Sequence, residues 1–94
     1  MTIGLLSIKT YLPAAHSLKD KRRILRKVID GIKHRHNVSI AEVGENDVWQ
    51  RADIAVCMVA NESAFVDSAL SKILNEIERN LEGEITSYSI DLSR

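Results

Sequence analysis

Two stretches of the chain place apolar residues on both faces of an extended strand, the first of them over its N-terminal half, and they are the strongest predictors of its fold. Thr2–Leu12 mixes β-branched and apolar residues, carries no charge before Lys9 and ends before Pro13, which cannot donate a hydrogen bond to a strand ladder. Asp53–Ala60 is apolar at both alternating sets of positions. Because a strand with two apolar faces is typical of the middle of a sheet, we expect both segments to be central strands.

Two other segments repeat their apolar residues with the period of a helix. The first runs from Leu18 to about Arg35, with Ser17 at the N-cap position and Asp20 three residues later. The second is predicted to begin with Ser63 as its cap and to end before Gly83. Its apolar side comprises Val66, Ala69, Leu70, Ile73, Ile77 and Leu81.

Two weaker strands complete the pattern, at Val38–Glu45 and, with an edge-like alternation, at Glu84–Leu92. The short link between the second and third strands suits antiparallel neighbours, and right-handed crossovers place both helices on one face. The sequence therefore predicts an α+β fold, a ferredoxin-like βαββαβ sandwich with a four-stranded antiparallel sheet. We expect residues 1–94 to form a single domain, because so short a chain cannot fill two cores.

Composition narrows the class of protein. Hydrophobic residues make up 45% and charged residues 28% of the chain, which excludes disordered, collagen-like and disulfide-rich classes. The lone Cys57 cannot form an internal disulfide, and no signal core or run of about 20 apolar residues is present, so we expect a cytoplasmic protein without a membrane span. Since Cys57 lies inside an apolar strand, we also expect a buried, unreactive thiol.

Charge is unevenly divided, although the formal net charge is zero. Residues 1–36 hold nine basic and two acidic side chains, a net of +7, and the remaining residues therefore carry −7. This asymmetry predicts either a basic surface for a polyanion or two opposed faces that pair between subunits.

The first predicted helix concentrates the basic residues on the side opposite its apolar face, with only Asp30 among them. A row of cations can follow the phosphates of a nucleic acid, whereas the alternative is a solvated helix face, which charge runs usually are. Lys21 stands apart at the edge of the apolar side, where we expect its ammonium group to reach water rather than to point into a cleft. The candidate nucleic-acid-binding residues are Lys19, Arg22, Arg23, Arg26, Lys27 and Lys33.

The connection before the third strand offers a candidate second contact, formed by Asp47, Trp49, Gln50 and Arg51. Binding residues concentrate in such loops, and Trp49 could stack on a base or enter a partner's pocket. Alternatively, Trp49 closes the end of the protein's own core and Arg51 pairs with Glu42 or Asp47. Tyr11 is the only aromatic residue of the central strands, so base stacking on the sheet itself is not expected.

Catalytic chemistry finds little support. His34 and His36 are two residues apart near a helix end, where their side chains diverge by about 200°, and no other ligand stands at zinc spacing. We predict no catalytic residues, no metal site and no cofactor. An enzyme remains the weakest alternative, and it would need a concave site built around Asp47 or Asp53.

Three motifs stand out at the first predicted helix, at the second strand and before the third: Ser17-Leu18-Lys19-x-Lys21-Arg22, Asn37-Val38-Ser39-Ile40-Ala41-Glu42-Val43 and Asp47-x-Trp49-Gln50-Arg51-Ala52. They resemble those of the YlxP-like family of small uncharacterised bacterial proteins, and the resemblance extends over nearly the whole chain. The resemblance implies a ferredoxin-like fold and a cytoplasmic protein whose gene commonly neighbours genes for transcription and translation factors. It implies no particular reaction.

These observations favour a non-enzymatic module that binds RNA or the small ribosomal subunit through the basic helix. The alternative is a protein-interaction or oligomerisation subunit whose basic helix meets an acidic protein partner. With both helices on one face, the apolar residues on the other face of the central strands would stay uncovered, so we expect a homodimer through the sheet face or edge.

Overall fold

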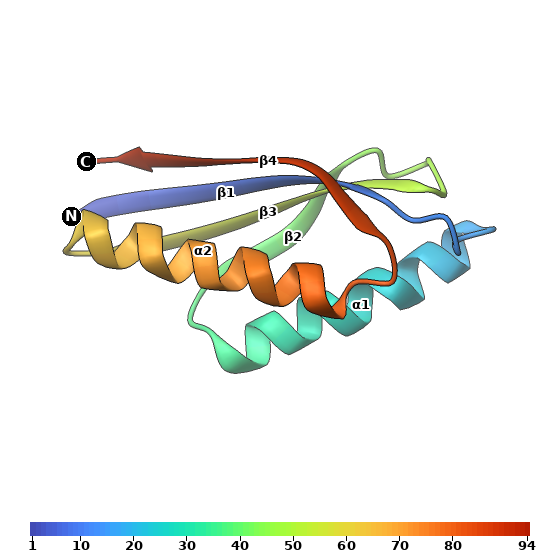
Figure 1. Ribbon diagram of the computed structural model, residues 1–94, viewed down its shortest axis with the longest axis horizontal. Helices are drawn as coiled ribbons and strands as arrows, with labels where there is room; N and C mark the ends of the chain where they lie inside the picture. Colours follow the sequence, from blue (N-terminus) through green and yellow to red (C-terminus); the bar gives the residue numbers. More distant parts are fainter.

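The computed structural model describes residues 1–94, and its elements follow the predicted order within a few residues of the predicted bounds (Figure 1). The helices are α1 (Leu18–Arg35) and α2 (Ser63–Asn80). The strands are β1 (Thr2–Tyr11), β2 (Ser39–Gly44), β3 (Arg51–Ala60) and β4 (Glu84–Ser93).

All four strands form one antiparallel sheet in the order β2-β3-β1-β4. The two doubly apolar strands, β1 and β3, are the central ones, as predicted, and they pair along their whole length from Thr2 opposite Ala60 to Tyr11 opposite Arg51. Both helices cover the same face of the sheet (Figure 1). The ferredoxin-like βαββαβ arrangement is therefore confirmed.

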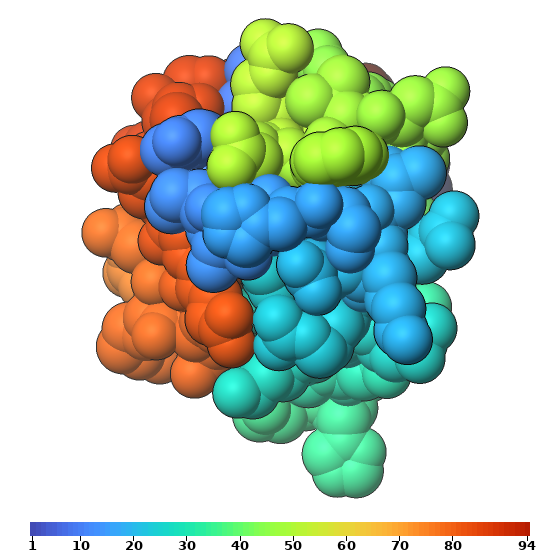
Figure 2. Space-filling view, turned by 90° about the vertical axis from the view of Figure 1, so that its right-hand side faces the viewer, coloured from blue at the N-terminus to red at the C-terminus, as the bar shows by residue number.

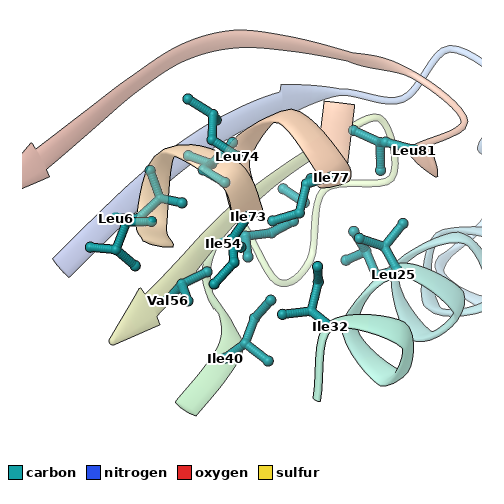
Figure 3. Close-up of a cluster of buried hydrophobic side chains, with 14 of the residues drawn as sticks. Leu6, Leu25, Ile32, Ile40, Ile54, Val56, Ile73, Leu74, Ile77 and Leu81 are labelled. Carbon is teal, nitrogen blue, oxygen red and sulfur yellow. The ribbon is translucent and has the colours of Figure 1, made fainter. Parts of the chain in front are cut away.

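The core lies between the sheet and the two helices (Figure 3). Alternation along β1 and β3 points Leu6, Ile54 and Val56 toward the helices, where they are fully buried. Gly4 belongs to the same face, and a Cβ atom there would lie 2.3 Å from Cγ1 of Val66. Only glycine therefore allows α2 to pack this closely on β1.

The two helices begin differently. Ser17 caps α1 as predicted, because its Oγ accepts a hydrogen bond from the backbone N–H of Asp20 at 3.0 Å. The predicted Ser63 cap of α2 is wrong: Glu62 occupies the N-cap position without a side-chain bond. The Ser63 hydroxyl lies 3.0 Å from the hydroxyl of Thr2 instead, so it joins the start of α2 to the start of β1.

The face of the sheet that turns away from the helices, here called the open face, carries exposed apolar side chains. Ile3, Leu5 and Val59 are 39%, 38% and 61% exposed, and Cys57 is exposed opposite Leu5. The predicted burial of Cys57 is wrong, because helices cover only one of the two apolar faces of β3. Neither helix combines the length and the hydropathy that crossing a membrane would require.

Candidate nucleic-acid interface

The basic face of α1, defined as Lys19, Arg22, Arg23, Arg26, Lys27 and Lys33, is exposed at every position. The helix presents these side chains outward because Ile24, Leu25, Val28 and Ile32 turn toward the core. A hollow of about 650 Å³ is lined entirely by charged residues of α1 and brings five of the six cations together with Asp20 and Asp30; Lys33 lies outside it.

The fold neutralises much of the charge asymmetry within a single chain. Four basic residues of the first 36 pair with acidic residues from later in the sequence: Lys9 with Asp53, Lys21 with Glu42, Arg23 with Glu82 and Arg35 with Glu76. The five basic residues left without an ion pair are Lys19, Arg22, Arg26, Lys27 and Lys33, and all five lie on the basic face of α1. Five of the eight basic residues of the chain without an ion pair therefore lie on one surface; the other three are Lys72, Arg79 and Arg94.

Lys21 has a different role from its neighbours on α1. The residue is buried, with 1% exposure, and its Nζ donates hydrogen bonds to the backbone carbonyls of Glu45 at 2.6 Å and Val48 at 2.7 Å. Oε2 of Glu42 lies 2.7 Å from the same Nζ; it accepts no hydrogen bond, so this contact is an ion pair. The ammonium group thus contacts three oxygen atoms, two as hydrogen-bond acceptors and one as the partner of an ion pair.

The predicted snorkelling of Lys21 is therefore wrong. Helical periodicity placed Lys21 at the edge of the apolar side, but the segment that closes over it comes from the connection between β2 and β3. This connection, residues 45–50 and here called the β2–β3 loop, begins at Glu45, whose φ of +59° lies in the left-handed region. Lys21 binds the carbonyl of that same residue, which helps to hold the strained backbone in place.

A second set of contacts fixes the end of the β2–β3 loop to the connection between β1 and α1. The backbone N–H of Leu12 donates to the carbonyl of Gln50 at 2.7 Å, and Nε2 of Gln50 donates to the carbonyl of Pro13 at 3.3 Å. Figure 2 shows the yellow-green loop lying directly on the blue segment that leads into α1. The candidate second contact therefore adjoins the N-terminal end of the basic helix.

Trp49 is 52% exposed, so the alternative in which it closes the protein's own core is wrong. It lines a groove of about 490 Å³, here called the aromatic groove, together with Tyr11, Asp47, Val48, Gln50 and Arg51. Arg51 pairs with Glu45 at 3.9 Å rather than with the predicted Glu42 or Asp47, because Glu42 is held by Lys21. All four candidate residues of the second contact thus line one groove. Tyr11 lines it as well, which the sequence had not predicted.

The C-terminal end of α1 carries a second cluster of charges. Glu76 of α2 accepts a hydrogen bond from Nε of Arg35 and contacts Nε2 of His36 at 2.7 Å. Partial burial acts to raise the pKa of Glu76, but the hydrogen bonds with His36 and Arg35 outweigh it, so the pKa lies below its usual value. This cluster joins the two helices at the end opposite the aromatic groove.

The carboxylates of the enzyme alternative do not share a site. Asp53 lies on the open face, 3.5 Å from Nζ of Lys9, whereas Asp47 lines the aromatic groove. No group of three histidine, cysteine or carboxylate side chains is placed to hold a metal ion.

Comparison with known proteins places the chain in a family. Residues 3–90 match the family model described as "Protein of unknown function (DUF503)". The chain belongs to this family. It is also 31% identical over 85 residues to the "Uncharacterized protein YlxP" of Bacillus subtilis (strain 168), across 84% of this chain and 92% of that relative. The YlxP-like resemblance carried by the three motifs is thereby confirmed.

Among solved structures, this member of the DUF503 family is similar to a de novo designed protein with a ferredoxin fold, determined by NMR in solution. The two structures superpose with a TM-score of 0.54 over 99% of this chain and 83% of the designed one, at 17% identity. At this identity the likeness supports the fold alone.

Proposed function

We propose that this protein is a non-enzymatic module that binds RNA, free or within the small ribosomal subunit, through the basic face of α1. The observation that carries the proposal is the distribution of unpaired charge: every basic residue of the first 36 that has no acidic partner lies on that one face. A protein with zero net charge that keeps five unpaired cations on one helix presents a local site for a polyanion.

The geometry of α1 suits a run of phosphates. Lys19 and Lys33 are 14 residues apart, which corresponds to about 21 Å along a helix at 1.5 Å per residue. Each phosphate that such a cation neutralises releases counterions, so affinity falls as salt rises, with a slope of about −0.7 per contact for a single strand. Only Arg23 must first leave an ion pair, with Glu82 at 3.8 Å, and both of those side chains are largely exposed.

A salt titration of RNA binding tests this surface. Purified protein is titrated with small-subunit RNA and with intact small subunits at several salt concentrations, alongside the double variant Arg22→Glu/Arg26→Glu. The matched control is Lys72→Glu/Arg79→Glu, which changes the net charge equally but alters exposed residues of α2. We expect the α1 variant to lose affinity and to flatten the salt slope, while the α2 variant keeps both close to the parent.

An equal loss of RNA affinity in the two double variants would mean that the net charge of the protein, and not the basic face, governs binding. Absence of binding at low salt would refute the RNA proposal. It would favour the alternative, in which the basic face of α1 meets an acidic surface of a protein partner.

We also infer that a second copy of the chain covers the open face. Ile3, Leu5 and Val59 are exposed on neighbouring positions of the two central strands, and a two-fold axis would bury these side chains against their copies. Sedimentation equilibrium tests this: we expect the mass of a dimer at micromolar concentration and of a monomer for Val59→Lys. A mass equal to one chain for the parent protein would contradict the dimer.

A further inference from the structure

The aromatic groove is built as a fixed part of the molecule although it lies in a loop. Lys21 binds the loop carbonyls of Glu45 and Val48, and Leu12 and Gln50 bind its far end to the connection that leads into α1. Contacts at both ends leave Trp49 between two anchored points. A side chain presented this way loses little conformational freedom on binding, which favours recognition.

The chemistry of the groove favours a flat, uncharged ligand. Two of the four aromatic side chains of the chain, Tyr11 and Trp49, line it, and both rings are exposed, by 38% and 52%. Its two charged residues, Asp47 and Arg51, have opposite signs. A phosphate in the groove would therefore meet the carboxylate of Asp47. A nucleobase is uncharged, and any of the four bases can stack its face on the indole of Trp49.

The basic face begins close to this groove. Lys21 lies on α1 between Lys19 and Arg22, so the residue that holds the loop is flanked by two cations of the candidate nucleic-acid interface. The basic face and the aromatic groove thus adjoin at the N-terminal end of α1 (Figure 2).

We propose that the aromatic groove binds one unpaired base of single-stranded RNA, stacked on Trp49, while the neighbouring phosphates lie on Lys19 and Arg22. Lys21 is then a positioning residue, which holds the groove at a fixed place relative to the basic face. This inference rests on the proposed function and adds to it a ligand class, because a base inside a duplex has no free face to offer to Trp49.

The fluorescence of Trp49 provides a direct test, because it is the only tryptophan of the chain. The probes are a short single-stranded RNA without self-complementarity and the duplex that it forms with its complement. We expect the single strand to quench Trp49 on binding and the duplex to leave its emission nearly unchanged. Affinity for each RNA is measured in parallel by anisotropy of a dye attached to the RNA.

Variants of Trp49 test the stack. We expect Trp49→Ala to weaken binding of the single strand by about 5- to 150-fold, the range that one base–aromatic stack contributes, and to leave duplex binding within about twofold. Trp49→Phe keeps an aromatic ring and should recover part of the loss. Val43→Ala is the matched control, since Val43 is also exposed but does not line the groove.

The role of Lys21 is tested by Lys21→Met, with circular dichroism to establish that the variant is folded. We expect the emission of Trp49 to shift in the free protein and the preference for single strands to fall, while duplex affinity stays close to the parent. Glu42→Gln keeps the lysine and its hydrogen bonds to two carbonyls. It should also lower the preference for single-stranded over duplex RNA, but by a smaller factor than Lys21→Met. It provides the test if Lys21→Met does not fold.

The outcomes separate the two proposals. Binding that requires Arg22 and Arg26, but is equal for both RNAs and unchanged in Trp49→Ala, would overturn the groove proposal and leave the basic face intact. Absence of binding to either RNA would overturn both. A preference for single strands that persists in Lys21→Met and Glu42→Gln would refute the positioning role alone.

Discussion

The two ends of α1 are each joined to a distant part of the chain by a cluster of charged groups, but the clusters differ in burial. At the N-terminal end, Lys21 is 1% exposed and binds one carboxylate and two backbone carbonyls. At the C-terminal end, the side chains of Arg35 and His36 are 47% and 32% exposed and bind only the carboxylate of Glu76. The carboxylates of the two clusters are similarly buried, but the cation of the first is enclosed by the fold whereas the basic groups of the second are partly open to water.

This difference determines what each cluster contributes. Water screens the charges of an exposed ion pair, which typically adds 0 to about 1 kcal/mol to the free energy of unfolding. A buried ammonium group cannot recover its lost hydration, so each of its partners is needed, and removal of one member leaves the others unpaired. We therefore expect the N-terminal cluster to be essential to the fold near the groove and the C-terminal cluster to be replaceable.

The largest effect is expected for Lys21→Met. The substitution keeps a side chain of similar length but leaves the Glu42 carboxylate and the carbonyls of Glu45 and Val48 without their cation. Loss of one partner of a buried pair costs about 3–5 kcal/mol, and we expect a decrease of that size in the free energy of unfolding. Urea denaturation followed by circular dichroism measures it.

The control for Lys21→Met is Lys27→Met on the exposed side of the same helix, which should change stability by no more than about 0.5 kcal/mol. A similar small change for both lysines would show that the buried cluster contributes no more than a surface charge does.

A smaller loss is expected for Glu42→Gln. The ammonium group of Lys21 keeps its two carbonyl acceptors, and the amide oxygen of glutamine can replace the carboxylate oxygen at similar distance. We expect a loss of about 1–2 kcal/mol, because the ammonium group loses the negative charge of its ion-pair partner but keeps an oxygen atom beside it. The same urea titration checks it; a loss as large as that of Lys21→Met would place most of the cluster's energy in the ion pair.

The same contrast explains which features could be predicted from the sequence. Periodicity identified both helices, the central strands and the six exposed cations, because these depend on which side of an element is apolar. It did not identify the partners of Lys21, because two of them, the carbonyls of Glu45 and Val48, lie beyond the irregular register that follows Glu42 and at or after the left-handed residue Glu45. Likewise, the alternation of β3 showed two apolar faces, but only the position of the helices decides that Cys57 is exposed.

At the exposed end, Glu76→Gln should cost about 0.5–1 kcal/mol at neutral pH, because Arg35 and His36 lose a carboxylate that water partly screens. Thermal unfolding at pH 7 measures the change, with Glu78→Gln, an exposed residue without an ion pair, as the control. A loss above about 3 kcal/mol would mean that this cluster resembles the buried one, and the comparison between the two ends would fail.

The contribution of Glu76 should also depend on pH, in a direction fixed by its pKa. Since the folded-state pKa lies below the reference value of 4.5, the contribution is fully present above 4.5 and disappears as the pH falls through the lower folded value. The stability difference between the parent and Glu76→Gln should therefore be largest near neutral pH and shrink in acid. A difference that grows as the pH falls from 5 to 3 would contradict the lowered pKa.

The smallest effect is expected for Arg23, the one member of the basic face that has an ion pair. Its nitrogen lies 3.8 Å from Glu82 and the two side chains are 61% and 49% exposed, so Glu82→Gln should change stability by less than about 0.5 kcal/mol. The same variant should raise RNA affinity slightly at low salt, because Arg23 no longer has an acidic neighbour. A loss of affinity would indicate that Glu82 orients Arg23 for binding. An exposed pair that is this easily broken leaves Arg23 available to a phosphate, whereas Lys21, enclosed by its three oxygen partners, can only act through the loop that it holds.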